Sequence, residues 1–203
     1  MKICNPNPYI QIPNTQNMIL AREKALALLR KYVKNEKMIA HCLASEAVMQ
    51  ALAVYLGRNA EAWALAGLLH DLDVEVTQAD AYTHGPEAAK WLAGMGVDED
   101  IVDAIGMHNE IASGKVRTTE FQHALAAGET ITGLIIATAL VYPDKKIASV
   151  KTKSVVKRMK EKAFAASVKR ENILECELIG IPIDTFAAIA ITAMTGIAEE
   201  IGL

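Results

Sequence analysis

Apolar residues recur at helical spacing along most of the chain. Between residues 18 and 34, Ile19, Leu26, Leu29 and Val33 repeat among charged side chains, which is the pattern of an amphipathic helix. Comparable apolar stretches, bounded by capping residues, glycine or proline, predict further helices at 36–56, 60–71, 86–94, 99–108, 120–141, 154–166, 171–179 and 184–201. Since no two segments form a convincing strand pair, the sequence predicts an all-α fold.

The helix boundaries come from residues that satisfy free backbone groups at helix ends. Asn59, Asp98 and either Thr118 or Thr119 precede apolar stretches and are predicted N-caps, and Asp184 is predicted to cap the last helix. Pro86 is typical of a first helical turn. These signals divide residues 18–203 into successive helices of one domain, preceded by an Asn- and Pro-rich stretch, residues 1–17, that predicts an irregular arm.

The composition supports close-packed helices in a reducing compartment. Hydrophobic residues make up 52% of the 203 residues and aromatic residues only 5%. The three cysteines lack the C-x-x-C spacing of zinc ribbons, and their odd number argues against a disulfide framework, so a cytoplasmic location is expected. Segment 124–142 is the most membrane-like, but it contains Glu129, which is costly in lipid. No membrane association is therefore expected.

The pair His70-Asp71 is the first candidate for chemistry. It stands at the end of the apolar helix 60–71, where a buried, unpaired carboxylate would be costly. Neighbouring helical residues point about 100° apart, so the two side chains can meet at one ion only where the helix ends. They either bind a metal or form a buried hydrogen bond without one, and the dipeptide alone does not decide between these.

Other potential ligands occur at helix ends or on apolar helix faces. His41 lies on the inward face of helix 36–56, and His84 precedes Pro86 at a helix N-terminus, where the dipole favours the neutral imidazole that binds metals. His108 ends helix 99–108, and Glu129 lies on an apolar stripe of helix 120–141. Each has an ordinary structural alternative as a core or capping residue. His123 is expected at the surface.

Together these residues resemble the HD superfamily of metal-dependent phosphohydrolases, whose motif reads H…HD…H…H…D. The correspondence runs through His41, through His70-Asp71 after Gly67-Leu68-Leu69, through His84 in Thr-His-Gly-Pro-Glu, and through His108 in Met-His-Asn-Glu. The similarity is greatest to small stand-alone HDIG-type hydrolases. It implies a multi-helix HD-type bundle with a core at about 36–142 and a basic helical extension at 145–203.

The sequence departs from the family pattern at two positions. The HDIG glycine is replaced by Asp73, and Glu129 stands where the family has its last aspartate. Glutamate still offers a hard oxygen, but its extra methylene changes the reach, so Glu129 binds differently, binds through water, or leaves one metal position weak. Asp73 or Glu75 is expected either to orient the attacking water or to support a ligand.

The resemblance implies a centre of one or two divalent transition-metal ions. His41, His70, Asp71 and Glu129 would hold one ion, and Asp71 would bridge to a second ion held by His84 and His108. Imidazole and carboxylate ligands without thiolate suit Fe, Mn, Zn, Co or Ni. Asp71, Asp73, His84 and His108 are the expected catalytic residues, and a small phosphorylated molecule, such as a nucleotide or dinucleotide, is the implied substrate.

The charge distribution adds a candidate for substrate binding. Segment 145–170 contains ten of the chain's 21 basic residues and a single acid, Glu161, although the net charge is −3. Lys153, Lys157 and Arg158 could attract a phosphate near the metal, or they could belong to a solvated helix face. Nucleic acid is not an expected partner, because few aromatic residues are available for stacking.

Two other functions are compatible with the same ligands. Some HD-fold proteins carry a di-iron centre and act as oxygenases, and the replacement of the last aspartate by Glu129 also allows a non-catalytic nucleotide-binding or regulatory domain. The apolar segment 186–201 either seals the core or pairs two subunits into a homo-oligomer.

Overall fold

The structure is a computed structural model, and it describes residues 18–203. The expected arm at 1–17 lies outside these residues. The described chain folds into ten α-helices and two short 3-10 helices and contains no strand, as the sequence predicted. The helices are α1 Arg22–Tyr32, α2 Glu36–Leu56, α3 Ala60–Leu69, α4 Pro86–Gly94, α5 Glu99–Met107, α6 Glu110–Ser113, α7 Glu120–Leu140, α8 Thr152–Arg158, α9 Arg170–Leu174 and α10 Ile183–Thr195, with 3-10 turns η1 Ile147–Ser149 and η2 Glu175–Glu177.

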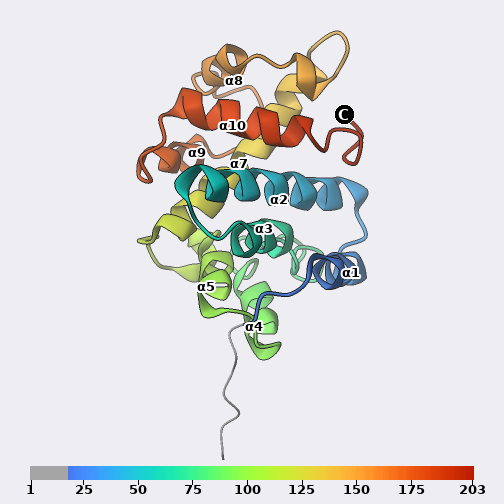
Figure 1. Cartoon of the computed structure of the whole chain (residues 1–203), viewed down its shortest axis with the longest axis vertical. Coiled ribbons are helices and arrows are strands. Elements are labelled where there is room, and N and C mark those ends of the chain that lie inside the picture. The colour runs from blue at the N-terminus through green and yellow to red at the C-terminus, as the bar shows by residue number, and fades with distance from the viewer. Residues whose placement is uncertain (1–17) are drawn as a thin grey trace, which may run out of the picture.

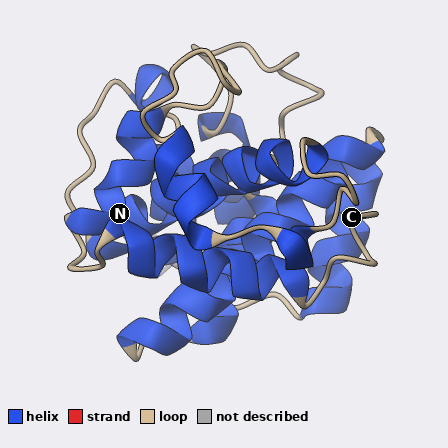
Figure 2. Cartoon of the chain, turned by 90° about the horizontal axis from the view of Figure 1, so that it is seen from above, coloured by secondary structure: helices blue, strands red, loops and turns tan. Residues whose placement is uncertain are grey.

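The helices are stacked in layers along the long axis of the molecule. In Figure 1, α2 crosses the middle, with α3 and α1 below it, α5 and α4 further down, α10 above it, and α8 at the top. The view from above in Figure 2 shows helices throughout, joined by loops. One continuous core, which includes Leu29, Leu52, Leu68, Ile131 and Phe186, runs through these layers.

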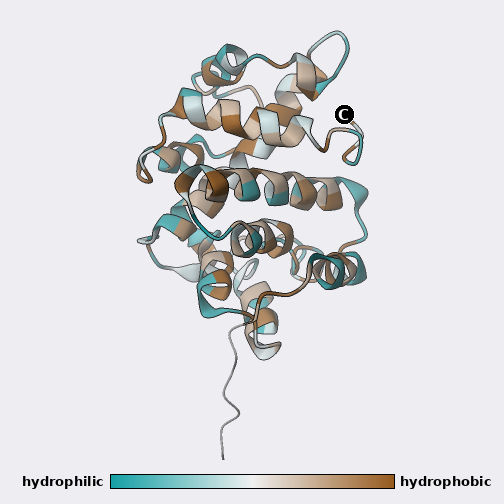
Figure 3. Cartoon of the chain, in the orientation of Figure 1, coloured by the Kyte–Doolittle hydropathy of each residue, from teal (hydrophilic) through white to brown (hydrophobic). Residues whose placement is uncertain are grey.

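Apolar and polar surfaces are divided in the way this stacking requires. In Figure 3, hydrophobic colouring recurs along α2 and α10, whereas the outer α1 is largely hydrophilic. Helices α2 and α7 are long and apolar enough to cross a membrane by length and composition alone. More than half of the relevant window of each, 56% for α2 and 67% for α7, is buried inside the protein, which is also the behaviour of core helices.

Three of the predicted N-caps form, at the starts of α3, α5 and α7. The Asn59 side chain accepts hydrogen bonds from the backbone amides of Glu61 and Ala62 at the start of α3. Thr119 caps α7 in a capping box with Gln122, and Asp98 caps α5. Favourable local chemistry therefore fixes where the three helices that lead to or carry the expected ligands begin.

The prediction was less successful in the C-terminal extension. Helix 154–166 was expected, but α8 ends at Arg158, and Ala165 has a φ of +46°. The Arg170 guanidinium donates to the carbonyl groups of Phe164, Ala165 and Val168, so a side chain a few residues further along satisfies groups that a continuing helix would pair internally.

The last helix also differs from its prediction. Helix α10 ends at Thr195 and is followed by turns, whereas the pattern predicted a helix to 201. Pro182, and not Asp184, occupies the N-cap position, and the Asp184 side chain accepts a hydrogen bond from the amide of Thr185 inside the first turn.

Candidate metal centre

Helix ends bring the expected histidines and Asp71 together. Helix α3 ends at Leu69, so His70 and Asp71 lie at the point where the chain leaves the helix and their side chains can converge. His108 is likewise the C-cap of α5, and His84 lies in the turn before α4. His41 belongs to α2 and is the fourth histidine whose side chain lies beside Asp71.

Asp71 is the centre of this arrangement. Its Oδ1 lies 2.8 Å from His84 Nε2, 3.3 Å from His70 Nε2 and 3.5 Å from His108 Nε2. Its Oδ2 lies 3.8 Å from His41 Nε2. Two groups result, His41–His70–Asp71 and Asp71–His84–His108, and within each group the ligand atoms lie within 4.8 Å of one another. Each group could hold a metal ion, and Asp71 belongs to both.

All four imidazoles are oriented in the same sense, with Nδ1 engaged outside the cluster. His70 Nδ1 donates to the carbonyl of Gly67 at 2.8 Å, and His108 Nδ1 donates to the carbonyl of Ile105 at 2.7 Å. A carbonyl oxygen can only accept, so both rings carry their proton on Nδ1 and present Nε2 to the centre.

The other two imidazoles are held by side chains. His84 Nδ1 donates to Asp73 Oδ1 at 2.7 Å. The hydroxyl of Thr132 donates to the carbonyl of Glu129 and is therefore available as an acceptor for His41 Nδ1, 2.9 Å away. Carboxylate and hydroxyl supports of this kind fix the ring orientation of metal-binding histidines.

This orientation leaves nitrogen atoms facing one another at short distance. His41 Nε2 lies 3.1 Å from His70 Nε2, and His84 Nε2 lies 3.2 Å from His108 Nε2. With Nδ1 protonated in each ring, two facing Nε2 lone pairs repel unless a proton or a cation lies between them. The donor set therefore fits a divalent transition metal of the imidazole- and carboxylate-binding type.

Burial and charge act on the protonation of the cluster. Burial lowers the pKa of His70 to about 3, so this ring is neutral and available as a ligand. Burial alone would raise the pKa of Asp71, but His70 and the other surrounding imidazoles outweigh it and hold that pKa well below its usual range.

His84 shows the opposite behaviour. Burial would lower its pKa, but the hydrogen bonds to Asp71 and Asp73, together with their charges, raise it to about 10. Without a metal, His84 is therefore an imidazolium between two carboxylates. A cation bound beside Asp71 would take the place of the Nε2 proton.

Asp73 supports His84, because both of its oxygens are engaged. Oδ1 accepts from His84, and Oδ2 accepts from the backbone amides of Gly85 and Ala88 at 2.8 and 3.0 Å. Its side chain is fully buried. Of the two roles expected for Asp73, this geometry matches the supporting one and leaves no free oxygen for a water. Glu75 is exposed and accepts from the amides of Lys34 and Asn35, at the start of α2.

Glu129 lies beside the centre without joining either group of ligands. Its Oε2 is 3.8 Å from His41 Nε2, and the hydroxyl of Thr130 donates to its Oε1. Burial raises the pKa of Glu129. A nearby cation would relieve the cost of that buried charge, so Glu129 is placed to interact with an ion held by His41, His70 and Asp71.

The basic residues expected to bind substrate do not belong to either group of ligands. Lys153 and Lys157 line a separate hollow that also includes Asp184, and α10 lies between α8 and α2 in Figure 1. The Arg158 guanidinium stacks 3.8 Å from the ring centre of Phe164. That these residues bind the substrate therefore stays a prediction.

Some contributors to the site were not identified in the sequence. Gly85 has a φ of +102°, and a Cβ there would come within 2.8 Å of the His108 ring, so both conformation and space require glycine. Thr132 carries no recognisable signal, because its role depends on a residue 91 positions away.

Arg117 was also missed. It is almost fully buried and donates to the carbonyls of Met107 and His108, at the end of α5. Its guanidinium is paired with the carboxylate of Glu175, which also lies 2.7 Å from His123 Nδ1. His123 is thus largely buried and not, as expected, a surface residue.

Comparison with known families agrees with this geometry. The family model of the HD domain matches residues 38–141, which include all six expected metal ligands. The chain belongs to the HD domain family. The search of curated proteins found no match. The HD match ends at the C-terminus of α7, so α8, α9 and α10 lie outside it.

Proposed function

We propose that this HD-domain protein is a metal-dependent phosphohydrolase that acts on a small phosphorylated molecule, a nucleotide or dinucleotide being the expected class. The observation that carries the proposal is the set of four Nε2 atoms directed at Asp71 from four separate segments. HD domains are commonly metal-dependent phosphohydrolases, and the His–Asp cluster is compatible with a divalent metal.

His41, His70 and Asp71 would hold one ion, with Glu129 beside it, and Asp71, His84 and His108 would hold a second. Bound there, a divalent metal supplies a Lewis acid that lowers the pKa of water and stabilises charge on a phosphoryl oxygen. The protein's own residues provide the rigidity for this chemistry. Backbone carbonyls fix His70 and His108, and Asp73 and Thr132 fix His84 and His41.

Metal content is the first test. Protein purified without chelator or a nickel-binding tag is expected to carry one or two divalent ions per chain by elemental analysis. His70→Ala should lose metal, because it removes one of the three ligands in the group His41–His70–Asp71. His123→Asn is the matched control, since it removes the one histidine whose ring does not face Asp71, and its metal content should remain at the wild-type value.

Activity is the second test. The metal-loaded protein is expected to release phosphate or nucleotide from a panel of phosphomonoesters, phosphodiesters and nucleotides, and His70→Ala should not. No hydrolysis across the panel would contradict the proposal. Oxygen consumption by the ferrous protein with a polyol or phosphonate would instead indicate an oxygenase, and a nucleotide bound but recovered unchanged would indicate a regulatory domain.

A further inference from the structure

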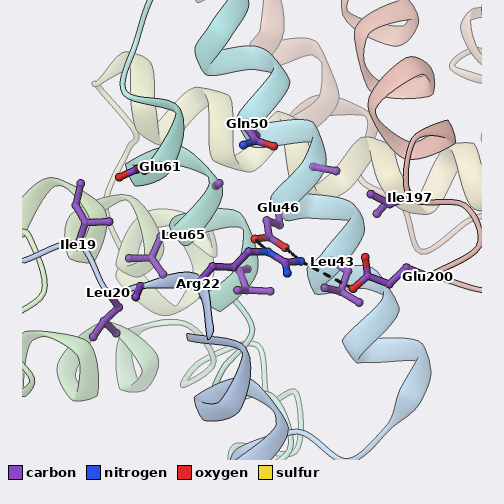
Figure 4. A pocket seen from close by; sticks show the side chains of 14 residues that line it. Ile19, Leu20, Arg22, Leu43, Glu46, Gln50, Glu61, Leu65, Ile197 and Glu200 are labelled. Atoms are coloured by element: carbon purple, nitrogen blue, oxygen red, sulfur yellow. Dashed lines mark hydrogen bonds and ion pairs between the residues drawn. The ribbon is translucent and has the colours of Figure 1, made fainter. Parts of the chain in front are cut away.

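A cavity separate from the His–Asp ligands lies between α1, α2, α3 and the C-terminal segment. Its volume is about 510 Å³, which is within the range of small-molecule sites. None of the expected metal ligands lines it. Figure 4 shows Leu65 and Ile19 on one side and Ile197 on the other, with the Arg22 and Glu46 side chains meeting between them.

The walls of the cavity are mainly apolar, and its charged groups are mainly acidic. Leu43, Leu65 and Leu68 contribute to the apolar surface, so an occupant needs an apolar body. Three carboxylates, Glu46, Glu61 and Glu200, line the cavity against a single cation, Arg22. The lining therefore carries an excess of negative charge.

The single cation is already engaged. Arg22 Nε and Nη2 donate to the two carboxylate oxygens of Glu46 at 2.6 and 2.9 Å, which is a bidentate ion pair. Arg22 Nη2 lies only 3.9 Å from Glu200 Oε1, a loose contact. Among the described residues no ion pair involves Glu61. The excess charge therefore comes from Glu61 and Glu200, on either side of the Arg22–Glu46 pair (Figure 4).

From these observations we infer that the cavity is a binding site for a small organic cation with an apolar body, such as an aliphatic amine. The apolar walls would bury the hydrocarbon part, and Glu61 or Glu200 would pair with the ammonium group. An anion of the same shape would meet two carboxylates, while the guanidinium it needs is held by Glu46. The site would thus discriminate by the sign of the ligand's charge.

A series of three ligands tests the charge preference directly. Hexylammonium, hexanol and hexanoate share one hydrocarbon chain and differ in the charge of the head group. In NMR titrations of the full-length protein, hexylammonium is expected to perturb the methyl signals of Leu43, Leu65 and Leu68 saturably, and to bind at least about tenfold more tightly than hexanoate at low ionic strength. Equal or tighter binding of hexanoate, or no saturable binding of hexylammonium, would overturn the inference.

Two sets of variants locate the site. Ala64→Phe places a ring into the cavity wall and should abolish hexylammonium binding, whereas Ala93→Phe, on the exposed surface of α4, should leave it unchanged. Joint replacement Glu61→Gln and Glu200→Gln should weaken hexylammonium binding about tenfold and leave hexanol binding unaltered. Glu199→Gln, an exposed neighbour outside the lining, is the charge control.

These variants also separate a structural effect from a loss of binding. The Gln replacements are nearly isosteric and leave the Arg22–Glu46 pair in place, so the protein should remain folded by circular dichroism. If hexylammonium binds equally well to the double Gln variant, or still binds to folded Ala64→Phe, the cavity is not its site. The result does not depend on the metal centre, since no activity is measured.

Discussion

At the residue scale, the metal centre depends on how each histidine uses its two nitrogens. The ligand types could be predicted from the sequence, because imidazole and carboxylate carry the chemistry wherever they lie. Their orientation could not, because it depends on the carbonyls of Gly67 and Ile105 and on the distant side chain of Thr132. Backbone acceptors have no residue-type signature, so only the folded chain reveals them.

The support of His84 by Asp73 yields a direct prediction. In Asp73→Asn, the remaining side-chain oxygen can still accept from the backbone amide of Gly85. The NH₂ group that replaces the other oxygen cannot accept a hydrogen bond from His84 Nδ1. Metal affinity is expected to fall about 10- to 100-fold, measured by competition with a chelating dye. Asp98→Asn is the control, because asparagine caps α5 as well as aspartate does. An unchanged affinity in Asp73→Asn would contradict the supporting role.

The pKa of His84 predicts how metal binding depends on pH. Below its pKa of about 10, His84 in the metal-free protein carries a proton on both nitrogens, and a bound metal requires Nε2 to lose one. His70, with a pKa of about 3, is already neutral and contributes no proton at neutral pH. Between about pH 7 and 9, affinity should therefore rise by about tenfold per pH unit, with one proton released per ion bound at the His84 group.

Calorimetric titrations in two buffers of different ionisation enthalpy measure that proton directly. The difference between the apparent binding enthalpies gives the number of protons transferred to the buffer. A metal affinity that is flat across this range, with no proton released, would show that His84 is not charged in the metal-free protein.

At the element scale, the centre requires α2 and α3 to approach closely. A Cβ on Gly67 would lie 2.5 Å from the carbonyl oxygen of Ser45 in α2, a backbone atom that cannot move aside alone. The same glycine supplies the carbonyl that orients His70. The helical periodicity that predicted α2 and α3 gave no indication of this contact, because spacing along one helix does not specify the distance to its neighbour.

Gly67→Ala is therefore expected to destabilise the protein by at least about 2 kcal/mol, because α2 and α3 must separate to admit the methyl group. Urea-induced unfolding measures this change in the free energy of unfolding. Gly94→Ala is the matched control, since it also lies in a helix but a Cβ there meets nothing within 4 Å. Gly94→Ala should unfold at the same or slightly higher urea concentration. Equal stability of both variants would mean that the two helices tolerate a wider separation.

At the scale of the whole molecule, the C-terminal extension contributes to the HD centre from outside the family match. Apolar spacing and capping signals were sufficient to predict the helices up to α7, except the short α6, which these signals did not predict. Beyond α7, side chains bind backbone carbonyls in place of helical hydrogen bonds, as Arg170 does with Ala165 and Val168 in the turn before α9. Apolar spacing does not indicate that an arginine will bind these carbonyls, so helix 154–166 was predicted too long.

Arg117 is the link between this extension and the metal ligands. Its guanidinium donates to the carbonyl of His108 at one end and pairs with Glu175 of η2 at the other. Asn172, in α9, accepts from Arg117 Nη2 and lies 3.4 Å from Thr130 Oγ1, beside Glu129. The extension thus contacts Thr130, the neighbour of Glu129, directly, and it reaches the end of α5 at His108 through Arg117.

Removing the Arg117 side chain should lower both the stability of the protein and its affinity for metal. Arg117→Met leaves the partly buried Glu175 carboxylate with His123 as its remaining partner and removes the donor to the carbonyl of His108, so a loss of about 3 kcal/mol in the free energy of unfolding is expected. The control is Arg58→Met, which removes a bidentate ion pair with Glu120 on the exposed surface. This variant should change the free energy of unfolding little. If Arg117 positions His108, the variant should also bind its second metal equivalent more weakly than its first, because only the His84–His108 group depends on α5. Equal weakening of both equivalents, or none, would reduce Arg117 to a purely structural residue.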